Sequence, residues 1–385
     1  MGVQFMALST EFLFLRDLII IFAIYLIITL SLNLEYGYAG IPNFGKVLAV
    51  AGGAFFVGFF PGRILAWIFE VGLDKDFIKY NRIIVAQESV ILQNLPFLSI
   101  AIFFLTLILA GLIGGLLGFV AAYPAIRLRE DYLAIMLLAM GEAIGVIGYN
   151  YTPLIGGTLG VSVPDVFRWA GEWRYVVSLL FILGISILVL LYLERLIRTP
   201  LGRMLRAIRD NEEVAESLGK DVTKIRTKTI VIASAIAAVG GALYAFNTCN
   251  VIAPTYNRVS WTFWPWVMMI LGGAANNMGV MLGTVIFVCV RKLIIYYKAQ
   301  LEPFVPFQVV WLDFLLLGVT LIIILMYRPE GIIKEKPTFT LSYEKIAELS
   351  DLKKAEEETP SKKKRIKEFL FEKLRRRRSN LGSGE

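Results

Sequence analysis

The chain of 385 residues contains no histidine and only two cysteines, Cys249 and Cys289. Without histidine there is no histidine-based catalytic triad and no histidine-liganded metal site, and few of the usual acid–base groups remain. Both cysteines are isolated among apolar residues, so they indicate neither a disulfide framework nor a metal site. The sequence therefore predicts a protein that is not an enzyme and that binds no cofactor itself.

Charged residues are also scarce. They make up 18% of the chain, whereas a typical soluble domain carries about 25%, and the mean hydropathy is +0.67. A helix that crosses a bilayer needs about 20 apolar residues, so the expected fold class is an all-α polytopic membrane protein with about eight or nine transmembrane helices, some broken or re-entrant. The apolar runs lie at 17–34, 42–60, 97–122, 131–149, 175–193, 230–249, 262–273, 277–297 and 311–327.

Basic residues indicate which loops face the cytoplasm, because Lys and Arg are enriched on that side. They fill the loop with Arg127 and Arg129, the segment 194–229, and the chain from Lys334 onward. Counting spans from these loops places the N-terminus outside and the C-terminus inside. The first ten residues lack the basic region of a cleaved signal peptide. One short apolar piece, Phe263–Leu271, is either a re-entrant segment or part of a crossing.

Hydrophilic parts divide the chain further. A membrane domain is expected over 1–333, with an external insert at 61–96 that Pro61-Gly62 opens and that has room for a surface helix. A second external loop covers 150–174. There Asn150 begins an Asn-x-Thr triplet, which is either a glycosylation acceptor or a chance sequence in a turn.

The tail at 334–385 is strongly basic. Residues 361–378 contain ten Lys or Arg side chains against two acidic ones. Such a cluster gains about 1 kcal/mol per charge near anionic lipid, so the tail either lies on the membrane surface or remains a solvated segment that sets the topology. Nucleic acid is not an expected partner, because the sequence of this segment has no pattern of a folded nucleic-acid-binding module.

The longest polar stretch between apolar runs is residues 199–221. Thr199 is expected to cap a helix with Pro200 at its first position, and Gly219 to end it. Asp221 then caps a second helix that continues into the span at 230. A push on the first helix would therefore tilt the second. The apolar stripe expected on the first helix comprises Leu201, Leu205, Ile208, Ala215 and Leu218.

This helix is basic at one end and acidic at the other. Arg203, Arg206 and Arg209 would suit a helix that lies on lipid. The acidic run that follows would not, because anionic lipid repels it. A protein partner explains this charge distribution better.

The same segment resembles the coupling loop of ABC importer permeases. The pattern Glu213-Val214-Ala215 followed after three residues by Gly219 is similar to the Glu-Ala-Ala and Gly of that loop, and Gly202–Glu212 is similar to the M-type permease of branched-chain amino acid importers. Further similar blocks follow in the order of that family: Leu32–Gly40, Arg127–Ile135, Gly156–Gly160, Leu271–Gly273 and Tyr327–Gly331.

The resemblance implies a multi-pass permease in the cytoplasmic membrane of a prokaryote that forms half of a translocation path. The implied partners are a second, H-type permease, two ATP-binding cassette ATPases that bind ATP and Mg²⁺, and an extracytoplasmic protein that delivers leucine, isoleucine or valine. Urea or short amides are alternative substrates. The residues implied in coupling to the ATPases are Arg206, Arg209, Glu212, Glu213, Ala215 and Gly219.

Two glycine-interrupted segments are candidates for the substrate path, because broken helices often line such paths. The alternative is close helix packing through small residues. The first segment, Gly40–Lys46, nearly matches a nucleotide-binding loop but lacks the final Ser or Thr and a preceding strand. Lys46 also departs from the family pattern. The candidate path residues are Gly37, Gly40, Asn43, Lys46, Glu142, Gly272, Gly273 and Asn276.

Glu142 lies inside an apolar run, where a carboxylate either lines a path or pairs with a basic residue. Glu35, Arg291 and Asp313 lie nearer the ends of runs, where charged side chains reach water more easily. A stand-alone secondary transporter or channel is the alternative function. It would need more buried ionisable groups than this to couple ions.

Overall fold

The computed structural model describes residues 10–72, 74–125, 130–298, 302, 311–328, 330–335 and 350, and all structural statements concern these residues. The chain divides into two compact units, Met1–Glu335 and Lys336–Glu385. Everything below concerns the first unit. The basic cluster at 361–378 and the pair Arg127 and Arg129 lie outside the described residues.

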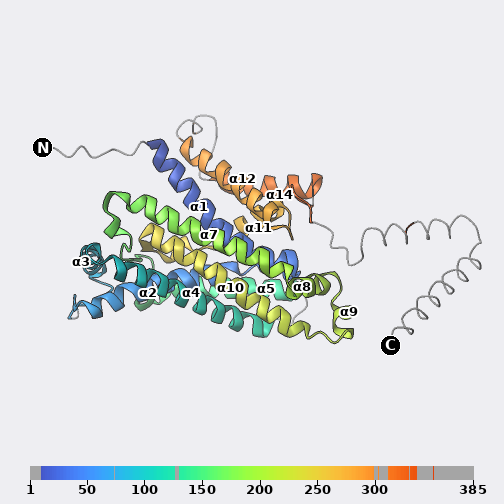
Figure 1. The fold of residues 1–385 in the computed structure, drawn as a ribbon, viewed down its shortest axis with the longest axis horizontal. Helices are drawn as coiled ribbons and strands as arrows, with labels where there is room; N and C mark the ends of the chain where they lie inside the picture. Colours follow the sequence, from blue (N-terminus) through green and yellow to red (C-terminus); the bar gives the residue numbers. More distant parts are fainter. Residues whose placement is uncertain are drawn as a thin grey trace, which may run out of the picture. The chain divides into compact units, whose positions relative to one another are not determined.

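The first unit is a bundle of helices, and its only strands in the described part are two short ones (Figure 1). Seven described helices are long and apolar enough to cross a membrane, which agrees with an all-α polytopic membrane protein. The long helices are α1 (Thr10–Asn33), α2 (Lys46–Ile68), α4 (Pro96–Ala125), α5 (Glu130–Asn150), α7 (Arg174–Arg198), α10 (Val222–Thr248) and α12 (Asn277–Tyr296).

Shorter elements connect or extend them. These are η1 (Leu34–Tyr38), α3 (Asn81–Gln93), α6 (Thr152–Ile155), β1 (Val161–Ser162), η2 (Arg168–Trp173), α8 (Pro200–Asp210), α9 (Glu212–Ser217), β2 (Asn250–Val251), η3 (Ala253–Thr255), η4 (Val259–Phe263), α11 (Trp264–Gly272) and α14 (Leu312–Tyr327). The two strands pair antiparallel, with Val161 opposite Val251.

The core forms where α10 packs against α2 and α4. Glycines allow the backbones to approach closely: a Cβ on Gly53 would lie 2.1 Å from the carbonyl oxygen of Ala238, and one on Gly241 would lie 2.0 Å from that of Val50. Close approach through small residues is the usual basis of helix association in membranes. These three helices therefore pack closely on one another, and α1, which also contacts α10, carries α7, α11 and α12.

The segment between α10 and α12 is a broken crossing. It begins at Cys249, whose carbonyl accepts a hydrogen bond from Val163 and which lines a cavity together with Arg174, the first residue of α7. It ends at Asn277, whose side chain donates to Glu194 in the last turn of α7. The segment therefore travels the length of α7. Its first part is mostly non-helical and its second part is η4 followed by α11, so the re-entrant alternative is wrong.

The insert begins later than expected. Pro61 does not open a loop, because α2 runs through it to Ile68. Proline is tolerated in membrane helices where neighbouring groups satisfy the freed carbonyl. The insert proper contains α3, which lies at the end of the bundle opposite α8 and α9 (Figure 1). It carries the buried Glu88, whose two carboxylate oxygens have no hydrogen-bond partner among the described residues.

The polar stretch at 199–221 also differs from the expected single helix. It is two helices, α8 and α9, separated at Asn211, whose side chain caps α9 by accepting from Val214 N–H. The Thr199 hydroxyl donates to Leu196 O at 2.6 Å instead of capping α8. Other expectations are confirmed: Pro200 opens α8, Gly219 has φ +75°, and Asp221 caps the long α10.

Candidate functional site

The helices α8 and α9 have one face packed on the bundle and one face open. Leu205, Ile208 and Ala215 are buried. Val214 and Leu218, one helical turn apart, are 53% and 72% exposed, so Leu218 does not belong to the buried stripe as expected. Glu213 is exposed beside them. We refer to Glu213, Val214 and Leu218 as the exposed face of α9. An acidic and apolar surface of this kind suits a protein partner.

Arg209 joins α8 to the end of α1. Its guanidinium donates to Gly37 O at 2.6 Å and forms an ion pair of 3.0 Å with Glu335. Arg206 lies over the ring of Tyr38 with its guanidinium carbon 5.4 Å from the ring centroid. Both cations therefore connect α8 to η1, the last turn of the first span.

A second connection leads from α9 to α10. Glu212 forms an ion pair of 2.7 Å with Arg226, whose side chain is 11% exposed. Gly219 then turns the chain with a positive φ, and Lys220 N–H donates to Ala215 O. Asp221 accepts from Lys224 N–H at 3.0 Å and begins α10. Apart from Glu213, which lies on the exposed face of α9, the coupling residues predicted from the sequence thus form two groups, one facing η1 and one facing α10.

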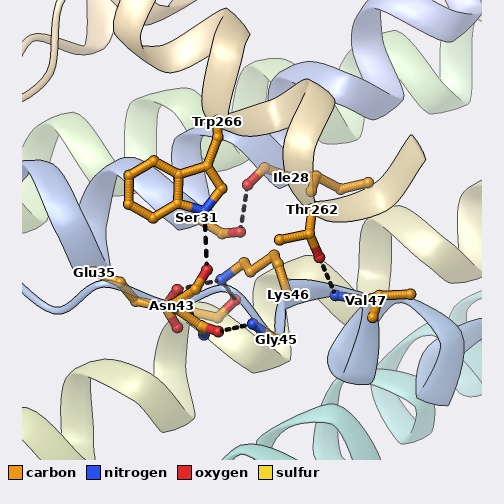
Figure 2. A network of polar contacts seen from close by, with 10 residues as sticks. Ile28, Ser31, Glu35, Asn43, Gly45, Lys46, Val47, Thr262 and Trp266 are labelled. Atoms are coloured by element: carbon orange, nitrogen blue, oxygen red, sulfur yellow. Dashed lines mark hydrogen bonds and ion pairs between the residues drawn. The ribbon is translucent and has the colours of Figure 1, made fainter. Parts of the chain in front are cut away.

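A buried ion pair joins η1 to the first residue of α2 (Figure 2). Glu35 and Lys46 lie 2.8 Å apart and both side chains are 0% exposed. Asn43 donates to the Glu35 carboxylate at 3.1 Å, and its own carbonyl accepts from the indole of Trp266 at 3.1 Å. Thr262 accepts from Val47 N–H. The network therefore links η1, α2, η4 and α11.

The expectation that Glu35 lies near water at a span end is wrong, because its side chain is fully buried. Lys46 and Asn43 are likewise enclosed in this network and do not line the cavities described below. Gly37 and Gly40 lie where α8 approaches: a Cβ on Gly40, which has φ +70°, would be 3.0 Å from the Arg209 side chain. A role of these four residues in the substrate path remains a prediction.

The second glycine-interrupted segment forms a close-packed turn. A Cβ on Gly272 would lie 2.1 Å from Gly279 O, and one on Gly273 would lie 2.2 Å from Ile333 O. Asn276 caps α12 and donates to Lys334 O. These contacts give Gly272, Gly273 and Asn276 a packing role, and their place on a path also remains a prediction.

Glu142 lies at a cavity of about 410 Å³ between α5, the non-helical segment before η4, and α12. It forms an ion pair of 3.4 Å with Arg258, so the expected pairing with a basic residue is found, yet the two side chains are 49% and 50% exposed. Arg291 lies 3.7 Å from the ring centroid of Trp264 in the same cavity. A neighbouring cavity of about 270 Å³ shares Glu142 and Gly145. Asp313 has no described side chain.

A third cavity of about 430 Å³ lies beside α3, at the end of α7 where that helix begins with Arg174. Three arginines line it, Arg16, Arg82 and Arg174, together with Asp165. Sequence reasoning missed Arg258 and these arginines, because each lies at the end of an apolar run or in a loop. Only the fold brings them together.

The comparisons with known proteins point to a transport family. A family model described as branched-chain amino acid transport system / permease component matches residues 14–325. A "probable branched-chain amino acid transport permease protein LivM" of Methanocaldococcus jannaschii is 43% identical over 333 residues, 86% of this chain and 96% of the relative. The LivM permease protein of the Escherichia coli high-affinity branched-chain amino acid transport system is 25% identical over 342 residues, 82% of this chain and 69% of the relative.

A second type of permease is also similar. A "probable branched-chain amino acid transport permease protein LivH" of Methanocaldococcus jannaschii is 24% identical over 302 residues, 75% of this chain and 83% of the relative. No solved structure matches the chain.

Proposed function

Because this chain belongs to the branched-chain amino acid transport system / permease component family, we propose that it forms half of the membrane path of an ABC importer for branched-chain amino acids. Separate ATPase subunits drive it. Relatives include both LivM and LivH permeases, so a second, H-type permease supplies the other half of the path. The family membership does not favour a stand-alone transporter or channel, or a permease for urea or short amides.

The observation that supports this proposal most directly is the exposed face of α9. This face offers a binding surface for an ATPase subunit, since Val214 and Leu218 are largely exposed, whereas Leu205, Ile208 and Ala215 pack on the bundle. Glu213 beside them supplies a charge for a basic residue of the partner. In this arrangement α8 and α9 lie on the cytoplasmic side, which places the N-terminus outside and the C-terminus inside, in the membrane of a prokaryote.

Movement of the docked ATPases, which bind ATP and Mg²⁺, reaches the spans by two contacts. Arg209 holds Gly37 at the end of α1, and Glu212 holds Arg226 in the first turns of α10. Because α10 packs on α2 and α4, a tilt of α10 moves the central three helices together. Glu35 and Lys46 carry the displacement of α1 to α2. The delivering protein docks at the opposite end, where α3 and the arginine-lined cavity lie.

The test is ATP-dependent uptake of labelled leucine into proteoliposomes. The full complex is reconstituted with this chain carrying Glu213→Lys, and a matched Glu172→Lys variant changes an exposed acidic residue in η2, far along the chain from α9. We expect Glu213→Lys to abolish uptake and to reduce copurification of the ATPases, because it reverses a charge on the docking face. Copurification equal to that of Glu172→Lys, together with uptake equal to that of the wild type, would refute the docking role.

A further inference from the structure

Residues 331–335 follow α14 and bind to the turn between α11 and α12. The Ile332 N–H donates to Leu271 O and the next N–H donates to Gly272 O, each at 3.0 Å. Both acceptors lie in the last turn of α11, where carbonyls have no partner within the helix. Asn276, which caps α12, donates to a carbonyl of the same segment at 3.0 Å. Segment 331–335 is therefore fastened to the ends of both helices.

The last residue of this segment, Glu335, contacts α8. One of its carboxylate oxygens forms an ion pair of 3.0 Å with Arg209, and the other lies 3.6 Å from Nε of Arg206. The two arginines are three residues apart, so they project from the same side of α8. Arg203 and Ala207 are exposed on another side of the helix. A carboxylate that holds two side chains of one helical turn opposes both displacement of the helix and its rotation about its axis.

These contacts attach α8 to two separate parts of the bundle. Arg209 binds Gly37 in η1 directly, and Glu335 attaches α8 to the end of α11. The two parts meet again at the loop between η1 and α2, where the Trp266 indole of α11 donates to Asn43 O (Figure 2). If α8 displaced η1 alone, this loop would be pulled away from α11. With Glu335 in place, η1 and α11 are both held to α8.

We propose that Glu335 is a positioning residue that makes α11 and α12 follow the movement of α8. This inference rests on the proposed function, because it adds a third connection to those that lead from α8 to η1 and from α9 to α10. The contacts of Glu335 lie on α8, away from the exposed face of α9. Loss of the carboxylate should therefore leave the ATPases bound and active, while fewer of their cycles result in transport.

The test compares leucine uptake with ATP hydrolysis by the complete complex in proteoliposomes. Glu335→Gln removes the charge and nearly keeps the size of a side chain that is 30% exposed, so we expect the protein to fold. Leucine uptake per ATP hydrolysed should fall about two- to tenfold, as for the loss of two partly exposed ion pairs. Copurification of the ATPases and the melting temperature should equal those of the wild type.

Two further variants separate transmission from a structural effect. Glu335→Asp keeps the charge on a shorter side chain, so it should restore most of the lost uptake per ATP. Glu330→Gln is the matched control, because Glu330 forms its ion pair with Lys334, four residues further along the chain, rather than with α8. This control should transport as much leucine per ATP as the wild type does.

The possible results also separate this inference from the proposed function. Uptake per ATP that is equal in Glu335→Gln and Glu330→Gln overturns the inference, while ATP-driven uptake by the wild type leaves the proposed function standing. A parallel loss of uptake and hydrolysis, or a lower melting temperature with an unchanged ratio, also overturns it, because the residue then serves only stability or assembly. If the wild-type complex takes up no amino acid, the proposed function fails and the inference fails with it.

Discussion

Leu218 and Leu205 offer a matched pair of substitutions that separates docking from folding. Leu218 is 72% exposed and Leu205 is 1% exposed, although both lie in the same short segment. Burying a leucine side chain completely contributes about 1.5–3 kcal/mol. If the ATPase covers the exposed part of Leu218, Leu218→Ala should weaken docking by about 1–2 kcal/mol, which is about 5- to 30-fold in affinity. Leu205→Ala should instead lower the stability of the permease by about 2–5 kcal/mol.

The assay combines two measurements on the same preparations. Affinity of the ATPase subunit for the permease in nanodiscs is measured by biolayer interferometry, and stability is measured by thermal denaturation in detergent. We expect Leu218→Ala to change the first and not the second. The reasoning is refuted if Leu218→Ala leaves the affinity unchanged, or if it lowers the melting temperature as much as Leu205→Ala does.

Three further predictions concern the fold. Lys46→Met should destabilise the protein by about 3–5 kcal/mol, because it leaves a buried carboxylate unpaired. Adding Glu35→Gln should recover most of this loss, as measured by thermal denaturation. A Lys46→Met variant as stable as the wild type would contradict the buried ion pair. Gly53→Ala should lower the stability of the protein by about 1–3 kcal/mol, since the new Cβ would lie 2.1 Å from Ala238 O. Gly184→Ala is the control and should leave the stability unchanged, because its Cβ would have no atom within 4 Å. Equal melting temperatures of the two variants would argue against the packing of α2 on α10. Burial raises the pKa of Glu88 from its ordinary value of 4.5 to about 8. Between these pH values the folded state holds a proton that the unfolded state releases, so stability should fall as pH rises through this window. Glu88→Gln should remove that fall, and a pH profile of stability that this variant leaves unchanged would show that Glu88 is not the group concerned.

Local signals in the sequence predicted local structure well. Asp221 and Gly219 were correctly assigned as a cap and a terminating glycine, because a cap depends on the few residues around it. Asn211 carries the same kind of signal, an N-cap residue followed by two glutamates, yet the continuous apolar stripe favoured a single helix. Pro61 was wrongly predicted to open a loop, because the effect of a proline on a membrane helix depends on neighbouring helices that the local sequence does not show.

The site residues were harder to predict, because their contacts join distant parts of the chain. The position of Glu142 in an apolar run indicated a paired or path-lining carboxylate, but its partner Arg258 is 116 residues away and follows a non-helical segment. Glu35 and Lys46 are only 11 residues apart, but the turn that brings them together is irregular. Hydrophobic periodicity predicts individual helices. It does not predict these contacts, because they depend on how the helices are arranged in space.

The central claim is that the exposed face of α9 holds an ATPase, and photocrosslinking tests it most directly. A photoreactive amino acid replaces Leu218 in one preparation of the complete complex and Tyr80 in another. Tyr80 is 44% exposed and directly precedes α3, at the opposite end of the bundle. We expect position 218 to crosslink to the ATPase subunit and position 80 not to. Crosslinking of the ATPase from position 80, or none from position 218 in an active complex, would contradict the account.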